Sequence, residues 1–167
     1  MRKMMLLVTF LPILAWAQNP VSDGLREMLA SRAKNTIAAA EEMPVDKYNY
    51  KPTPAQQPFE HWVSHATQAN YFLCSKLTDA TAPQAGVKEG DPKDKLIDAL
   101  KKSFDYCSAQ LPKLQDSKLG DEITVFGNRK STKGATALEI SADWADHYAQ
   151  MASYLRLNGL LPPTAKK

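Results

Sequence analysis

Four stretches of the sequence place apolar residues three and four positions apart, and segments rich in Pro, Gly and polar residues separate them. This spacing lines one face of an α-helix, and that face has to be buried against other helices. No pattern of several alternating strands is present. We therefore predict an all-α fold, a four-helix bundle, and 167 residues are enough for one hydrophobic core.

Breaks in the periodic pattern set the bounds of the four predicted helices. Pro44 ends the first helix, Asp91 is the predicted N-cap of the third, and Gly159 caps the last. A short extended segment with a turn near Gly127–Asn128 is predicted before the last helix. The predicted helices cover about residues 22–43, 58–77, 92–111 and 132–158.

The beginning of the chain differs in composition from the rest. Two cations precede an apolar run from Met4 to Trp16, and alanines stand at positions 15 and 17. This order is typical of a secretory signal peptide, and the run is shorter than the roughly 20 apolar residues of a membrane anchor. We expect residues 1–17 to be removed. Residues 18–167 would then form the bundle domain, exported to the periplasm or secreted, without a stable membrane anchor.

The net charge argues against one class of partner. The chain has 21 Lys and Arg against 18 Asp and Glu, and loss of the two cations of the signal peptide lowers the excess from +3 to +1. Nucleic-acid binding depends on clustered cationic residues. We therefore expect no nucleic-acid partner.

The sequence contains three histidines, and imidazole is the commonest metal ligand and acid–base group near neutral pH. At about 100° per residue, His65 falls about 60° from the centre of its helix's apolar stripe, and His61 about 100°. His61 is therefore predicted to lie closer to solvent. On the last helix, His147 lies about 70° from the centre and Asp143 about 110°. Asp143 and His147 are four residues apart and share a face.

These positions suggest a metal site at the border between two helices. If the two borders face each other, His65, Asp143 and His147 can hold a divalent transition metal and leave positions open for water or substrate. His61 is then either a competing ligand or a group that orients His65. The alternative is an ordinary ion pair between Asp143 and His147 within one helix.

Three segments of the sequence resemble the DinB/YfiT-like superfamily of bacterial metalloenzymes. They are KYNYKPTP, FEHWVSHATQANYFLCSKL and DWADHYAQMASYLRLNGLLPP, and together with the first helix they span nearly all of residues 18–167. The resemblance implies a four-helix bundle in which a long crossover makes the second and third helices parallel.

The resemblance also implies a metal site with one His from the second helix and an H-x-x-x-H pair from the last. His65 matches the first of these ligands and His147 the last. Asp143 stands at the middle position, so the chain departs from the usual three-histidine set. We expect a divalent transition metal, namely nickel, zinc, iron or manganese, at His65, Asp143 and His147.

The implied crossover also determines how the two cysteines are placed. Residues 78–92 can span about 50 Å when extended, enough to return along a helix about 30 Å long. Cys74 lies about 24 Å from the start of its helix and Cys107 about 21 Å from the start of the next, so parallel helices bring them level. We predict a Cys74–Cys107 disulfide in an exported protein; the alternative is two small buried thiols.

Two functions are compatible with these features. The resemblance implies a metal-dependent enzyme of transferase or hydrolase type, which activates a thiol or water and acts on a small molecule. Its catalytic residues and substrate are unknown. The alternative is a non-catalytic exported bundle with a binding or stress-related role. The sequence leaves open a homodimer in both cases.

Overall fold

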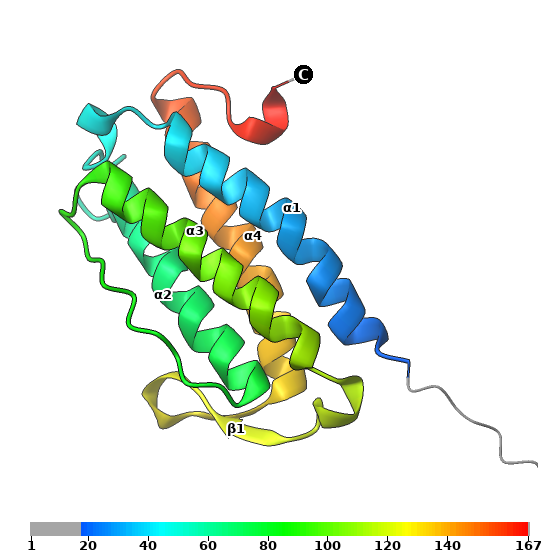
Figure 1. Ribbon diagram of the computed structural model, residues 1–167. Coiled ribbons are helices and arrows are strands. Elements are labelled where there is room, and N and C mark those ends of the chain that lie inside the picture. The colour runs from blue at the N-terminus through cyan, green and yellow to red at the C-terminus, as the bar shows by residue number, and fades with distance from the viewer. Residues whose placement is uncertain (1–17, 167) are drawn as a thin grey trace, which may run out of the picture.

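The computed structural model describes residues 18–166, and four α-helices pack side by side in it (Figure 1). The predicted bundle is confirmed, and each helix end lies within two residues of its predicted position. The predicted signal peptide, residues 1–17, lies outside the described residues. The helices are α1 (Pro20–Glu42), α2 (Phe59–Thr78), α3 (Lys93–Gln110) and α4 (Lys133–Leu157).

Helices α2 and α3 run in the same direction. Both begin at the end of the bundle that carries residues 43–58, and residues 79–92 return along the length of the bundle to join them (Figure 1). The long crossover is therefore present. The crossover affects the site because it runs from the end of α2 back along the bundle and finishes beside the start of α2.

The extended segment before α4 is a short antiparallel hairpin. Strand β1 (Glu122–Thr124) pairs with β2 (Lys130–Thr132). The turn lies at Gly127 and Asn128, as predicted, and both have positive φ, 64° and 60°. Glycine and asparagine are the residues that tolerate this left-handed conformation best. The hairpin leads directly into α4, where Thr132 caps the helix by accepting a hydrogen bond from an amide of the first turn, at 3.2 Å.

Short 3₁₀-helices complete the connections between these elements. They are η1 (Val45–Lys47), η2 (Leu111–Lys113), η3 (Asp116–Lys118), η4 (Phe126–Asn128) and η5 (Pro163–Ala165).

The predicted N-cap of α3 is wrong. Pro92 directly precedes the helix, and no side chain makes a cap hydrogen bond there. The carboxylate of Asp91 instead accepts hydrogen bonds from the backbone N–H of Lys88 at 2.9 Å and from the ammonium of Lys95 at 3.0 Å. Asp91 therefore stabilises the last turn of the crossover and does not cap the helix.

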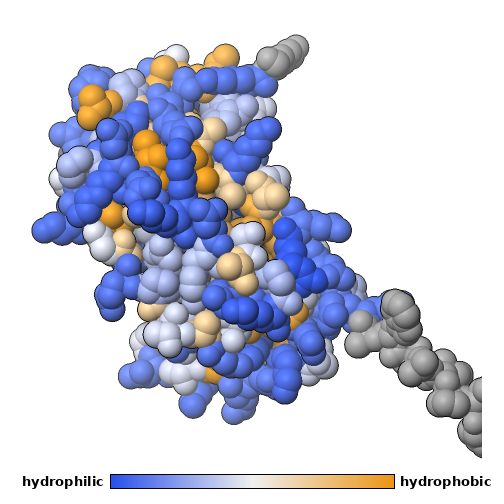
Figure 2. All heavy atoms as spheres, in the orientation of Figure 1, coloured by the Kyte–Doolittle hydropathy of each residue, from blue (hydrophilic) through white to orange (hydrophobic). Residues whose placement is uncertain are grey.

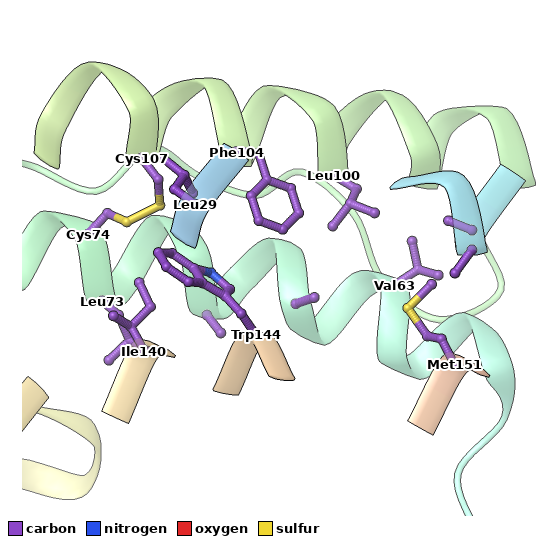
Figure 3. Close-up of a cluster of buried hydrophobic side chains, with 14 of the residues drawn as sticks. Leu29, Val63, Leu73, Cys74, Leu100, Phe104, Cys107, Ile140, Trp144 and Met151 are labelled. Atoms are coloured by element: carbon purple, nitrogen blue, oxygen red, sulfur yellow. A yellow bond between two sulfur atoms is a disulfide. The ribbon is translucent and has the colours of Figure 1, made fainter. Parts of the chain in front are cut away.

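The core lies between the four helices and consists of apolar side chains from all of them (Figure 3). The face seen in Figure 2 is mostly hydrophilic, with small scattered apolar patches. Within residues 18–166, no helix combines the length and the apolar character needed to span a bilayer. The largest fully buried side chains are Trp144, Tyr154, Phe59, Leu25, Met43, Leu73, Leu77, Leu96, Leu100, Leu111, Ile140 and Met151.

A disulfide joins the two parallel helices. Cys74 on α2 and Cys107 on α3 are bonded, their Cα atoms are 5.4 Å apart, and both side chains are fully buried (Figure 3). The two cysteines can meet because the helices are parallel and each cysteine lies the same number of turns from its helix start. The disulfide therefore links α2 and α3 covalently in their parallel arrangement.

Replacing both Cys74 and Cys107 by Ala should lower the free energy of unfolding by about 3 kcal/mol. The bridge spans 33 residues of sequence, and the chain entropy that it removes from the unfolded state grows with that span. Urea denaturation of the two proteins measures the difference. Wild-type protein reduced before unfolding should resemble the variant; equal stability of oxidised and reduced wild type would contradict the prediction.

Candidate metal centre

The first turn of α2 sets the direction in which its histidines point. The backbone N–H groups of Phe59 and Glu60 donate hydrogen bonds to carbonyl oxygens of the preceding connection, at 3.1 and 2.9 Å. A helix start leaves such N–H groups without partners inside the helix, so these bonds hold the first turn in place. The positions of His61 and His65 around the helix axis follow from that anchor.

A buried amide then fixes α2 against α4 close to the histidines. The Oδ1 atom of Asn70 accepts a hydrogen bond from the indole N–H of Trp144 at 2.7 Å, and its amide donates to Ser103 on α3 at 3.0 Å. Trp144 directly follows Asp143, and Asn70 lies five residues after His65. The bond therefore sets which part of α4 faces the N-terminal half of α2.

This registration brings His65, Asp143 and His147 together. Each of the three offers one ligand atom, and these atoms all lie within 4.8 Å of one another. The rings of His65 and His147 meet edge to face with centroids 5.0 Å apart. Asp143 Oδ2 lies 3.4 Å from His147 Nδ1. The two helix borders therefore face each other, as the metal-site hypothesis required.

Two of the three ligand candidates carry buried atoms without a hydrogen-bond partner. Within residues 18–166, neither Asp143 Oδ2 nor His147 Nδ1 has a partner, and the His147 side chain is only 3 % exposed. A buried polar atom left unpaired costs free energy, so native proteins nearly always pair it. A cation between the two atoms would satisfy both. The donor set therefore fits a metal ion.

The surroundings of His65 and His147 favour the neutral form of both side chains. Burial, and then the neighbouring His65, lower the pKa of His147 to about 4. Partial desolvation of its ring, and then His61, also lower the pKa of His65. A neutral imidazole keeps a nitrogen lone pair for a metal ion and does not have to release a proton first.

The carboxyl group of Asp143 shows the opposite shift. Burial, followed by the negative charges of Asp146 and Glu139, raises its pKa to about 6. The ionised form is therefore disfavoured in the folded protein unless a positive charge approaches. A metal ion at this position would supply that charge.

His61 lies beside the group and is not a member of it. Its ring is stacked on that of His65, with centroids 5.4 Å apart and planes inclined by 10°, and its Nδ1 lies 2.6 Å from Glu89 Oε1. The role of orienting His65 stays a prediction for His61, and the stacked rings are compatible with it. The predicted order of exposure is wrong: His65 is exposed, and His61 is only 23 % exposed because the crossover covers it.

Trp62, next to the ligand group, has a hydrogen-bond donor without an acceptor within residues 18–166. This indole N–H is buried, and the ring of Trp62 lies 6.1 Å from that of His147. A tryptophan at helical spacing among apolar residues is usually part of the core. The structure leaves Trp62 half-buried at the edge of the candidate site.

A hollow of about 400 Å³ opens on the solvent side of His65. Sequence reasoning missed its outer wall, which belongs to the crossover. The only available signal was the length of that connection, because a loop that returns along α2 has to end beside the first turns of that helix. The lining residues are His61, Ser64, His65 and Gln68 of α2, and Lys88 and Glu89 of the crossover.

Comparison with known families gives a clear result. The sequence model of the DinB superfamily matches residues 28–151, which is most of the chain. The chain belongs to the DinB superfamily. No curated protein matches the sequence of this DinB-superfamily chain.

Solved structures of other DinB-like proteins have the same fold. A DinB-like protein of Bacillus subtilis is 24% identical, with a TM-score of 0.68 over 86% of this chain and 99% of that one. A DinB-like protein of Bacillus cereus is 14% identical, with a TM-score of 0.70 over 89% and 98%. A protein of Exiguobacterium sibiricum assigned to the DinB family is 17% identical, with a TM-score of 0.65 over 83% and 92%. At these identities the likeness establishes the fold alone.

In metal-free protein, Asp143→Asn should raise the melting temperature by a few degrees at about pH 8. The ionised carboxylate is disfavoured in the folded state, and the neutral amide removes that cost. The gain should shrink as the pH falls below about 6, where the folded protein protonates Asp143. Thermal denaturation in excess chelator measures both effects. Asp105→Asn, at an exposed position of α3 outside the ligand group, is the control, and an equal gain from it would contradict the explanation.

Proposed function

We propose that this protein is a divalent-metal-dependent enzyme that activates a thiol or water, of transferase or hydrolase type. The observation that carries the proposal is the pair of buried atoms without partners, Asp143 Oδ2 and His147 Nδ1, with His65 in reach of the same point. The two atoms lie 3.4 Å apart, yet no hydrogen bond joins them within residues 18–166, whereas a purely structural pair is expected to form one. Membership of the DinB superfamily supports the proposal.

The choice of ligands favours certain metals. Two imidazoles and one carboxylate suit nickel, zinc, iron or manganese better than calcium or magnesium, which prefer oxygen ligands alone. Asp143 contributes a negative charge where the usual DinB pattern has a neutral histidine. The site of this chain therefore offsets one of the two positive charges of the ion.

A bound divalent ion would supply Lewis acidity that lowers the pKa of a coordinated thiol or water. The side chains of this chain do the remaining work. His147 is fixed by burial between α2 and α4, while His65 lies at the wall of the hollow and is reached from solvent. A small molecule that enters the hollow therefore meets the ligand group on the His65 side. His61 restricts the ring of His65 by stacking on it.

Metal binding is the direct test of the proposal. Purified metal-free protein incubated with cobalt(II) or zinc(II) and then desalted should retain about one ion per chain by elemental analysis. His147→Ala should weaken binding by about 100-fold or more, since the loss of a ligand exceeds the 10- to 100-fold loss found for groups that only orient ligands.

The chain offers matched controls for each ligand type. His61→Ala removes a histidine one turn from His65, and Asp146→Ala removes an aspartate three residues from Asp143. Asp146→Ala should keep the stoichiometry, and His61→Ala should keep it at saturating metal with a weaker affinity, because His61 orients His65. His65→Ala and Asp143→Ala should lose the bound ion. An unchanged metal content in the His147→Ala protein would refute the metal centre and leave a non-catalytic bundle.

We also propose that the protein functions outside the cytoplasm. The disulfide between Cys74 and Cys107 supports this, since such bonds persist mainly in oxidising compartments. The mature chain should begin at Gln18. N-terminal sequencing of protein isolated from the periplasmic fraction or the medium of an expressing bacterium measures this, and intact protein confined to the cytoplasm would contradict it.

A further inference from the structure

The end of the crossover is anchored onto α2 at two points. The Nδ1 atom of His61 lies 2.6 Å from a carboxylate oxygen of Glu89, and the backbone N–H of Gly90 donates to a carboxylate oxygen of Glu60 at 3.0 Å. Gly90 has a φ of 83°, a conformation that favours glycine. The outer wall of the hollow therefore has a defined position relative to His65.

Lys88 is presented by this anchored loop. Its backbone N–H donates to Asp91 Oδ2 at 2.9 Å, so the residue is held at a fixed point of the turn. Its ammonium makes no ion pair within 4.0 Å among residues 18–166, because the nearby carboxylate of Asp91 is bonded to Lys95 at 3.0 Å. Lys88 therefore lines the hollow without an ion pair of its own among residues 18–166, although the carboxylates of Asp91 and Glu89 lie nearby.

The remaining charges around the hollow are already engaged. The carboxylates of Glu89 and Glu60 accept the hydrogen bonds that anchor the loop. With a divalent ion at the ligand group, the positive charges of the ion and Lys88 would balance the negative charges of Asp143, Glu89 and Glu60. Lys88 is the cationic side chain among the residues that line the hollow. The other lining side chains, Ser64 and Gln68, are neutral and polar.

We propose that this hollow binds a small organic anion, with Lys88 opposite its acidic group and its reacting group directed toward His65. The inference rests on the proposed metal centre and names the substrate class that the centre serves. The ammonium of Lys88 selects the charge of the substrate, while the ligand group binds the thiol or water that reacts. The crossover is thus a wall of the binding site as well as a connection.

Two thiols of equal length test the proposal, 2-mercaptoethanesulfonate and uncharged 2-mercaptoethanol. Each is titrated into the cobalt(II) form of the full-length mature chain, and the absorption of the thiolate–cobalt bond reports binding. A sulfonate is a poor metal ligand, and the attraction of the ion for its charge is the same in wild type and in Lys88→Gln, so the difference between these two proteins measures the contribution of Lys88. The anionic thiol should bind about fivefold more tightly at low salt, as expected for a partly exposed ion pair, and the preference should fade at high salt.

Variants at the surface keep the test independent of folding. Lys88→Gln should reduce the preference for the anionic thiol, and Lys88→Arg should retain it. Lys102→Gln removes one cation from the outer face of α3, outside the hollow, and should behave as wild type. Since both probes are thiols at equal concentration, any effect on the disulfide is common to the two titrations.

The outcomes separate this inference from the proposed function. Protein that takes up cobalt but binds both thiols equally overturns the role of Lys88 and leaves the metal centre standing. A preference that Lys88→Gln leaves undiminished also overturns it. Protein that takes up no cobalt overturns the metal centre, and the anion site falls with it.

Discussion

The relative placement of three helices depends on one buried amide. Asn70 accepts from Trp144 on α4 and donates to Ser103 on α3, so a single side chain on α2 fixes both neighbours. Apolar packing alone tolerates small rotations of one helix against another. A buried amide without hydrogen-bond partners costs free energy, so the helices adopt the arrangement in which both bonds of Asn70 form. That arrangement places Asp143 opposite His65. The candidate metal centre is therefore a consequence of a polar contact in the core.

The candidate metal centre lowers the free energy of unfolding of the metal-free protein. His147 is almost fully buried with an unpartnered nitrogen, and the carboxyl of Asp143 has a raised pKa. A sequence optimised only for folding would place apolar residues at these positions. The three donors are instead held close together, and within residues 18–166 Asp143 Oδ2 and His147 Nδ1 make no hydrogen bond that would compete with a ligand. This arrangement is expected where a bound ion completes the structure.

The crossover between α2 and α3 gives this bundle features that an up-and-down bundle would lack. It makes two consecutive helices parallel, which lets Cys74 and Cys107 meet, and it returns a charged turn to the first half of α2. There Glu89 and Lys88 have separate roles, one anchoring the loop through His61 and the other facing the hollow. One topological feature thus links the disulfide, the orientation of the histidines and access to the site.

The apolar periodicity of the sequence was sufficient to determine four helices and their bounds to within two residues, because helix formation and its Pro and Gly breaks are local. The i, i+4 spacing likewise placed Asp143 and His147 on one face of α4. The sequence could not determine the distance from His65 to that face, the reversed exposure of His61 and His65, or the position of Lys88. Those depend on contacts between residues far apart in the chain: the Asn70–Trp144 bond and the return of the crossover over α2. Only the tertiary structure decides them, since burial of a side chain depends on what packs against it and not on its helix alone.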